Sequence, residues 1–380
     1  MPSLRSGPPY HMTEMIAAEP ALARRILSRL ADPGGPAARL AEAIRSAAVA
    51  GAPISVVGCG TSEHGALGAV EILRDAMGQA GLPAWAGSPV SMQAFEAALE
   101  PAPGGLCIGV SHEGGTWATN RALEAARAAG ATVALITVSD RSPGAALADI
   151  VVTTEEMDQS WCHTIGYLSP LLAATAVGAH LAASSVDPEV VSALLAEGAR
   201  DEAGAEGLAS ETLAAAIAMA DRLIVVASGA DRPAGRELVL KVEEASWLPS
   251  AFRDLETFLH GHLPAMDGRT ALLLILADRA RRAERIERAA EALAASRVVG
   301  IRAGAILAEG VAAELDVSLT PAGRLLVRDA PALPMPVAAL LGTATPLQLL
   351  AERLASARGT NPDPIRRDDP RYREAAAQAR

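Results

Sequence analysis

The stretch ISVVGCGTSEHG, residues 54–65, decides the fold of this chain. A short β-branched run at residues 54–57 meets a glycine-rich turn at Gly60, and a helix-forming stretch follows at once. Strand, small-residue turn and helix in this order are typical of parallel α/β sheets. At such a turn the backbone N–H groups and the hydroxyls of Thr61 and Ser62 are suited to an anion.

The same pattern recurs along the chain and predicts an α/β fold made of two tandem three-layer αβα units with parallel sheets. Two amphipathic helices are expected within residues 11–50. The predicted strands are residues 54–57, 105–110, 131–137, 150–153, 223–227, 271–275, 297–301 and 315–318. Later helices are expected at residues 233–247, 280–294 and 335–356.

With 380 residues the chain exceeds the size at which one core usually stops growing, so two domains are expected. The predicted organisation is N-terminal helices at 1–50, a first domain at 51–187, connecting helices at 188–220, a second domain at 221–357 and a tail at 358–380. The tail is rich in Pro, Asp and Arg, and we expect it on the surface or folded over a site.

Composition excludes several classes of protein. A net charge of −11 without a basic stripe argues against nucleic acid as a partner. The three cysteines form no CxxC pair, and the N-terminus lacks an apolar signal segment, so a cytoplasmic protein is expected. Residues 159–186 hold no charged side chain, but their serines, histidine and proline favour a buried helix over a membrane span.

A second polar turn follows the next predicted strand. It holds Ser111, His112, Glu113 and Gly114, and it ends at Thr116 before another helix. Two such turns after neighbouring parallel strands make a concave site at a switch point of the sheet. Hydroxyl side chains at that position predict a phosphate or a polyhydroxylated ligand.

No cofactor is expected. Glu63 stands where a dinucleotide-binding turn needs its third glycine, and no acidic residue closes the next strand, expected at residues 82–86. A GK[ST] phosphate loop does not occur. His260 and His262 lack neighbouring ligands for a metal site.

Lysine occurs once, at Lys241, among 33 lysines and arginines. Glu237, Lys241 and Glu244 recur at helical spacing and therefore share one stripe of a helix. An ammonium is a compact charge that a guanidinium does not replace. This row is either a solvated ion-pair ladder or part of an active site.

At this point the chain resembles the sugar isomerase (SIS) domain family, in particular the tandem isomerase half of glucosamine-fructose-6-phosphate synthases. CGTS at residues 59–62 is similar to the first sugar-phosphate loop of the family. SHEGGT at residues 111–116 is similar to the second loop, usually SQSGET, and Ser160 is similar to a serine of the third. The resemblance covers nearly the whole chain.

LKVEE at residues 240–244 resembles the LKLKE motif of the family, and the interval from Glu244 to His260 equals that between its catalytic glutamate and histidine. The resemblance implies Glu244 as the proton shuttle between C1 and C2 and His260 as the acid/base that opens the sugar ring. Lys241 would support the developing charge. Because the family histidine comes from a neighbouring subunit, at least a homodimer is implied.

Three departures from the family pattern bear on activity. No glutaminase unit precedes the first isomerase unit, and the tail lacks the lysine of the family synthases, so synthase activity is not expected. Glu113 replaces a serine that touches phosphate. Either Glu113 turns away and pairs with an arginine or His112, or the ligand there lacks a phosphate or bears an amine.

We therefore expect a phosphosugar isomerase or isomerising deaminase acting on a sugar phosphate without glutaminase activity. One alternative is a deglycase that cleaves amino-acid adducts of sugar phosphates. A second is a non-catalytic sugar-phosphate sensor that acts through a protein partner. The sugar, the fate of an amine and the role of the tail stay open.

Overall fold

The computed structural model describes residues 5–83, 87–200, 203–204 and 207–378. Contacts divide the chain into two compact units. The N-terminal unit comprises Glu19–Asp158 and Ile165–Ser192. The C-terminal unit comprises Met1–Ala18, Gln159–Thr164 and Ala193–Arg380.

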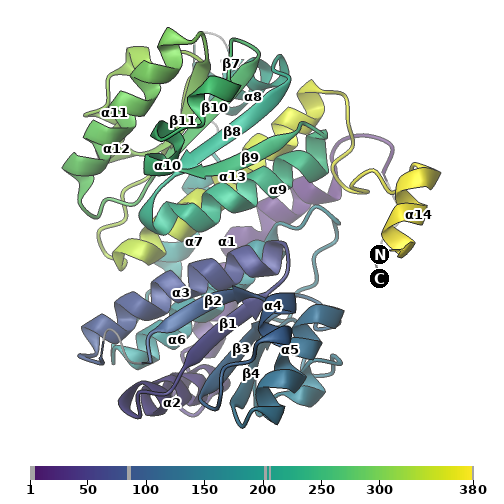
Figure 1. Cartoon of the computed structure of the whole chain (residues 1–380), viewed down its shortest axis with the longest axis vertical. Coiled ribbons are helices and arrows are strands. Elements are labelled where there is room, and N and C mark those ends of the chain that lie inside the picture. The colour runs from purple at the N-terminus through teal and green to yellow at the C-terminus, as the bar shows by residue number, and fades with distance from the viewer. Residues whose placement is uncertain (1–4, 84–86, 201–202, 205–206, 379–380) are drawn as a thin grey trace. The chain divides into compact units, whose positions relative to one another are not determined.

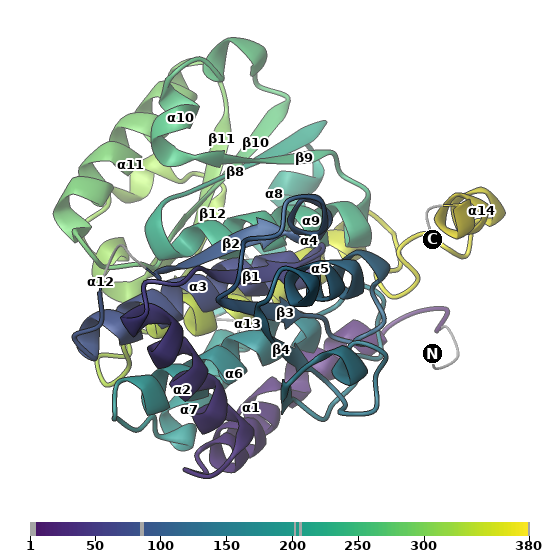
Figure 2. The ribbon, with the colours of Figure 1, turned by 60° about the horizontal axis from the view of Figure 1, so that its bottom comes forward.

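The N-terminal unit is built on a five-stranded parallel sheet with the order β2-β1-β3-β4-β5. Its strands are β1 (Ile54–Gly58), β2 (Pro89–Gln93), β3 (Leu106–Val110), β4 (Thr132–Thr137) and β5 (Ile150–Thr153). Its helices are α2 (Pro36–Val49), α3 (Thr61–Gln79), α4 (Ala94–Leu99), α5 (Trp117–Ala128), η1 (Ala145–Leu147) and α6 (Ile165–Leu181). Helices α4 and α5 lie side by side in Figure 2, and α2, α3 and α6 pack together.

The C-terminal unit repeats this topology with the order β9-β8-β10-β11-β12. Its strands are β8 (Arg222–Ala227), β9 (Ser250–Asp254), β10 (Thr270–Leu276), β11 (Arg302–Ala308) and β12 (Gly323–Val327). Helices α8 (Ala209–Ala218), α9 (Arg232–Ser246) and α13 (Met335–Ala357) pack together, and α11 (Arg282–Val298) lies on the opposite face of the sheet from α13 (Figure 1). The tandem αβα fold class predicted from the sequence is confirmed.

Shorter elements complete the chain. They are η2 (Gly229–Asp231), α10 (Leu255–Leu259), η3 (Leu263–Ala265), α12 (Glu309–Ala312), η4 (Val317–Leu319), α14 (Pro370–Gln378) and the short strands β6 (Ala203–Gly204) and β7 (Gly207–Leu208). Helices α1 (His11–Leu30) and α7 (Pro188–Gly198) each have residues in both units.

The core of each unit consists of strand side chains packed on helices. In the C-terminal unit, Leu272 and Leu274 of β10 pack in one buried cluster with Phe258 of α10 and Leu293 of α11. Helix α6 of the N-terminal unit is buried on nearly all sides, which accounts for the uncharged stretch at residues 159–186. Within the described part of the chain, every helix is too short or too polar to cross a membrane.

Two strand predictions are wrong. Residues 297–301 form the last turn of α11 and the turn at Gly300, and the strand follows at Arg302–Ala308. Residues 315–318 form a turn in which Asp316 accepts the Ser318 N–H at 2.9 Å, and the strand lies at Gly323–Val327. At 297–301 the β-branched Val298 and Val299 lie at the end of a helix, and the strand that follows is rich in alanine and glycine. At 315–318 the segment is a turn, and the strand begins five residues later.

The edge strands β2 and β9 were not predicted at their observed positions. Residues 84–86 of the strand expected at 82–86 lie outside the described residues, and β2 follows at Pro89–Gln93. The sequences PVSMQ and SAFRD lack a continuous apolar run, because an edge strand is only partly covered.

Candidate functional site

The first predicted loop lies where β1 ends and α3 begins. Gly60 has φ 57° and ψ −128°, a conformation that favours glycine. A Cβ on Gly58 would lie 2.5 Å from the carbonyl oxygen of Ser62, so only glycine lets the strand meet the helix so closely. The buried Thr61 and half-buried Ser62 begin α3. Two hydroxyl side chains therefore stand at the positive end of this helix dipole.

The second predicted loop follows β3, the neighbour of β1 in the sheet. Ser111 is fully buried, and its hydroxyl donates to the Thr116 hydroxyl at 3.3 Å. Gly114 has φ 65°, and a Cβ there would lie 2.1 Å from the Ser142 hydroxyl. Since β1 connects to one side of the sheet and β3 to the other, the two loops flank its topological switch point.

His112 points into the N-terminal unit. Its side chain is buried, and its Nε2 accepts the backbone N–H of Asp158 at 2.9 Å. Asp158 in turn accepts the Gly166 N–H at 3.1 Å. This geometry gives His112 a part in holding residues before the third predicted loop, beside its predicted role in ligand binding.

Glu113 is exposed. No arginine, lysine or histidine among residues 5–83, 87–200, 203–204 and 207–378 forms an ion pair with it. Its carboxylate therefore stands in solvent beside the hydroxyls of the second loop, and the pairing with an arginine or His112 considered from the sequence does not occur.

Helix α9 of the C-terminal unit buries the predicted charged row. Lys241 Nζ lies 2.5 Å from Glu244 Oε2 and 3.6 Å from Glu237 Oε1. Lys241 and Glu237 are fully buried, whereas the Glu244 side chain keeps 21% of its exposure. The row is therefore not a solvated ladder, and Glu244 is the member that solvent reaches.

Burial and charge act against each other in this row. Burial alone would lower the pKa of the Lys241 ammonium, but attraction to Glu244 and Glu237 outweighs it and raises that pKa. Burial raises the pKa of Glu244, and the adjacent ammonium limits the rise. Glu244 is thus a partly exposed carboxylate whose pKa lies above its ordinary value, as a general base requires.

Two residues beside this row were assigned no role from the sequence. The Cys162 thiol lies 3.9 Å from the Lys241 carbonyl oxygen and hydrogen-bonds the Glu244 carboxylate. Burial and the nearby Lys241 charge lower the pKa of His163 to about 4, so its imidazole is neutral at pH 7. Both residues lie far from α9 in the sequence, so no local pattern predicted that they are close to it. Ser160, the predicted contact of the third loop, belongs to the same segment and is fully buried.

His260 ends α10, and its side chain is 69% exposed. Its Nε2 lies 2.6 Å from Glu256, and hydrogen bonds from Arg288 and His260 lower the pKa of Glu256 to about 2. The hydrogen-bond partner of the His260 imidazole is therefore Glu256 and not Glu244. His262 Nδ1 accepts from Arg253 at 3.2 Å, and the described residues bring no three potential metal ligands together.

The tail packs on the C-terminal unit. Asp363 is buried and accepts the N–H groups of His11 and Met12 at 2.8 and 2.9 Å, which caps the start of α1. Farther along, the guanidinium of Arg366 lies 4.4 Å from the Trp247 ring and 4.0 Å from the Tyr372 ring.

No protein-family model and no curated protein matches this sequence. Solved structures do match. The C-terminal domain of glucosamine-fructose-6-phosphate aminotransferase from Francisella tularensis is 18% identical, with a TM-score of 0.77 over 95% of this chain and 99% of that one. Tagatose-6-phosphate ketose/aldose isomerase from Escherichia coli is 18% identical, with a TM-score of 0.73 over 96% and 97%.

Glucosamine-6-phosphate deaminase from Thermotoga maritima is 15% identical, with a TM-score of 0.65 over 93% of this chain and 97% of that one. The chain has the fold of the phosphosugar isomerases. The resemblance to the sugar isomerase domain family is thereby confirmed for the fold. At these identities the comparison assigns no residue a role.

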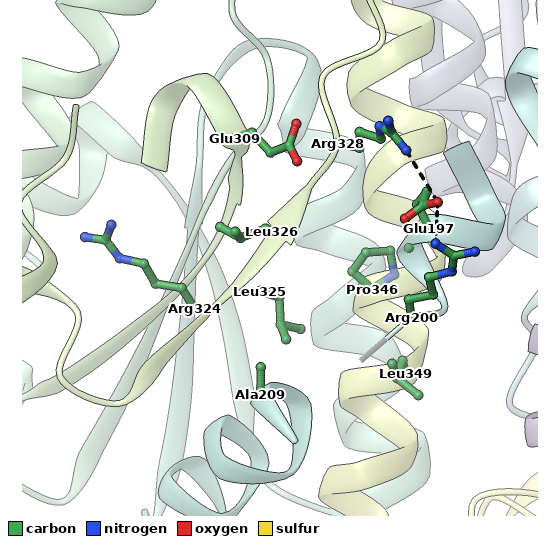
Figure 3. A pocket seen from close by; sticks show the side chains of 11 residues that line it. Glu197, Arg200, Ala209, Glu309, Arg324, Leu325, Leu326, Arg328, Pro346 and Leu349 are labelled. Carbon is green, nitrogen blue, oxygen red and sulfur yellow. Dashed lines mark hydrogen bonds and ion pairs between the residues drawn. The ribbon is translucent and has the colours of Figure 1, made fainter. Parts of the chain in front are cut away.

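The C-terminal unit holds a cavity of about 330 Å³ (Figure 3). It is lined by β12 and by residues of α7 and α13. Glu197 pairs there with Arg200 at 2.8 Å and with Arg328 at 3.4 Å. None of the predicted catalytic or binding side chains lines it.

Proposed function

We propose that this protein is a phosphosugar isomerase or isomerising deaminase that moves a proton between C1 and C2 of a sugar phosphate. The observation that carries the proposal is the Glu237–Lys241–Glu244 row, in which a buried ammonium adjoins the partly exposed carboxylate of Glu244. Burying the charges of Lys241 and Glu237 is costly, and a solvated ion-pair ladder would not require it. The fold supports the same class of activity.

In this proposal Glu244 takes the proton from C2 of the open-chain aldose and returns it to C1. The electron pair of the broken C–H bond forms the enediol, and the hydroxyl proton moves to the former carbonyl oxygen. Lys241 stabilises the negative charge that develops. With a 2-amino sugar the same transfer gives an imine at C2, and water then releases ammonia and leaves the ketose phosphate.

The proposed ligand contacts are the hydroxyl groups and turns of the three loops. They are Gly60, Thr61, Ser62, Ser111, Gly114, Thr116 and Ser160, with His112 and Glu113 in the second loop. Hydroxyl groups and helix N-termini bind phosphate and sugar oxygens through hydrogen bonds. These contacts need no cofactor.

The decisive experiment follows deuterium at C1 and C2 by proton NMR in D2O. The substrates are fructose-6-phosphate and, separately, glucosamine-6-phosphate, with ammonia assayed alongside. Exchange without ammonia establishes an isomerase, and exchange with ammonia a deaminase. Glu244→Gln is expected to slow exchange by about 100- to 10,000-fold, because a general base is lost.

Glu243→Gln is the matched control, since Glu243 is exposed on the same helix and its side chain accepts the Ser250 N–H at 3.0 Å. Binding of sugar phosphate to Glu244→Gln should persist. Binding without turnover in the parent protein would instead identify a sensor and contradict the enzymatic proposal.

We assign ring opening to His260 and propose that it acts on the site of a second copy of the chain. The exposure of its side chain and its hydrogen bond to Glu256 rather than to Glu244 support this assignment. Glu244→Gln and His260→Ala should each be inactive alone, and mixing the two after reversible dissociation should restore part of the activity. A mixture that stays inactive would place both residues in one subunit's site.

A further inference from the structure

The switch point of the N-terminal unit carries an exposed aromatic pair. Trp117, the first residue of α5, is 64% exposed, and Phe95 of α4 is 42% exposed. Their ring centroids lie 6.3 Å apart with planes inclined by 32°. Aromatic residues make up only 3% of this chain, so two of them exposed and in contact need an explanation.

Hydrogen bonds place Phe95 beside the first loop. The side-chain oxygen of Gln93 accepts the Phe95 N–H at 2.7 Å, and its nitrogen donates to Cys59 Sγ at 3.7 Å. Cys59 also packs in one apolar cluster with Ala94 and Ala118, the neighbours of the two aromatic residues. The pair therefore borders the turn at residues 58–62.

Trp117 connects the pair to the second loop. It follows Thr116 directly and lies four residues after Glu113, the exposed carboxylate that has no ion-pair partner in the described part of the chain. An aromatic face and a carboxylate both attract ammonium groups, the first through its quadrupole and the second through its charge. Neither attracts a phosphate.

We propose that Phe95, Trp117 and Glu113 recognise a protonated amine with an apolar substituent, attached to the sugar phosphate. This inference rests on the proposed function and names its substrate class: an N-substituted amino sugar phosphate. The phosphate lies at the first loop, away from Glu113, where hydroxyls and the N-terminus of α3 favour an anion. The apolar substituent lies against the aromatic pair.

Calorimetric titration of the 380-residue chain with three probes tests this assignment. The probes are fructose-6-phosphate, 1-amino-1-deoxyfructose-6-phosphate and 1-benzylamino-1-deoxyfructose-6-phosphate. The benzylamino compound is expected to bind about tenfold more tightly than fructose-6-phosphate. Trp117→Ala should remove most of that advantage and leave the affinity for fructose-6-phosphate unchanged.

Glu113→Gln should weaken both aminated probes about threefold more than it weakens fructose-6-phosphate, because an exposed charge contact is modest. Leu99→Ala on α4 and Glu124→Gln on α5 are the controls, as both positions are exposed and should change no affinity.

Equal affinity of the parent protein for all three probes would overturn the inference and leave the proposed function standing. No binding of any probe would overturn both. If Trp117→Ala changed the sedimentation coefficient of the protein and no ligand affinity, the pair would be a contact between copies, and the inference would be wrong.

Discussion

The two sheets share one strand order, yet their switch points are built differently. In the N-terminal unit the turns after β1 and β3 hold glycines and hydroxyls, and Glu113 and Thr116 are exposed. In the C-terminal unit the turns after β8 and β10 hold Asp231 and Asp278, which are buried and each accept backbone N–H groups of these turns. Topology therefore provides two switch points. The first exposes polar side chains, and the second is closed by buried carboxylates that bind N–H groups of its own turns.

The closed switch point is a reciprocal ion and hydrogen-bond network. Asp231 accepts the N–H groups of Ala277 and Asp278 at 2.9 Å each, and Asp278 accepts the Ala230 N–H at 2.9 Å. Arg285 of α11 donates to Asp278 at 2.7 Å. The network holds the start of α9, so it also positions the helix that carries Glu244.

The comparison is tested most strongly by removing one carboxylate from each switch point. Asp278→Ala should lower the free energy of unfolding by about 3 kcal/mol, because it removes the carboxylate that pairs with the largely buried Arg285 guanidinium. Glu113→Ala should change it by less than about 0.5 kcal/mol, as an exposed residue without a partner. Urea unfolding followed by circular dichroism measures both, and equal effects would contradict the distinction.

A pH series sharpens the same contrast. Burial and the charge of Asp278 raise the pKa of Asp231 from 3.8 to about 7, against the opposing effect of Arg285 and two backbone N–H groups. Between these values the folded protein holds a proton that the unfolded chain releases. Stability should therefore fall as the pH rises towards 7, by at most about 1.4 kcal/mol per pH unit, and level off above it.

Asp231→Asn should flatten this slope, because the amide cannot ionise. Urea midpoints measured from about pH 5 to pH 8 for the parent and the variant provide the test. A slope that survives in Asp231→Asn would assign the pH dependence to another group.

Two glycine substitutions compare the turns of the two switch points and are expected to give the smallest difference in stability. Gly229 has φ 59°, and a Cβ there would lie 2.1 Å from the Arg285 guanidinium. Gly229→Ala should therefore cost about 2 kcal/mol of stability. Gly115 has open space around it, and Gly115→Ala should be nearly neutral. Thermal unfolding of the two variants distinguishes the filled turn from the open one, and similar midpoints would remove the distinction.

Strong local patterns were predicted well. The strand at residues 54–57 was recognised because a buried parallel strand is a continuous apolar run ended by glycine. The strand at Arg302–Ala308 was missed because alanine and glycine fill much of it, whereas the β-branched Val298 and Val299 lie at the end of a helix. Local propensity is overruled there by packing.

The candidate site likewise has some features that follow from local sequence and others that follow from packing. By itself the sequence determined the helical row of Glu237, Lys241 and Glu244 and the two polar turns, because both depend on spacing within a few residues. Only the tertiary structure decided that the row is buried, that Cys162 and His163 lie beside it, and that Glu113 stands in solvent. Burial and contacts between distant segments depend on how the elements pack, and packing sets the dielectric environment that determines each pKa.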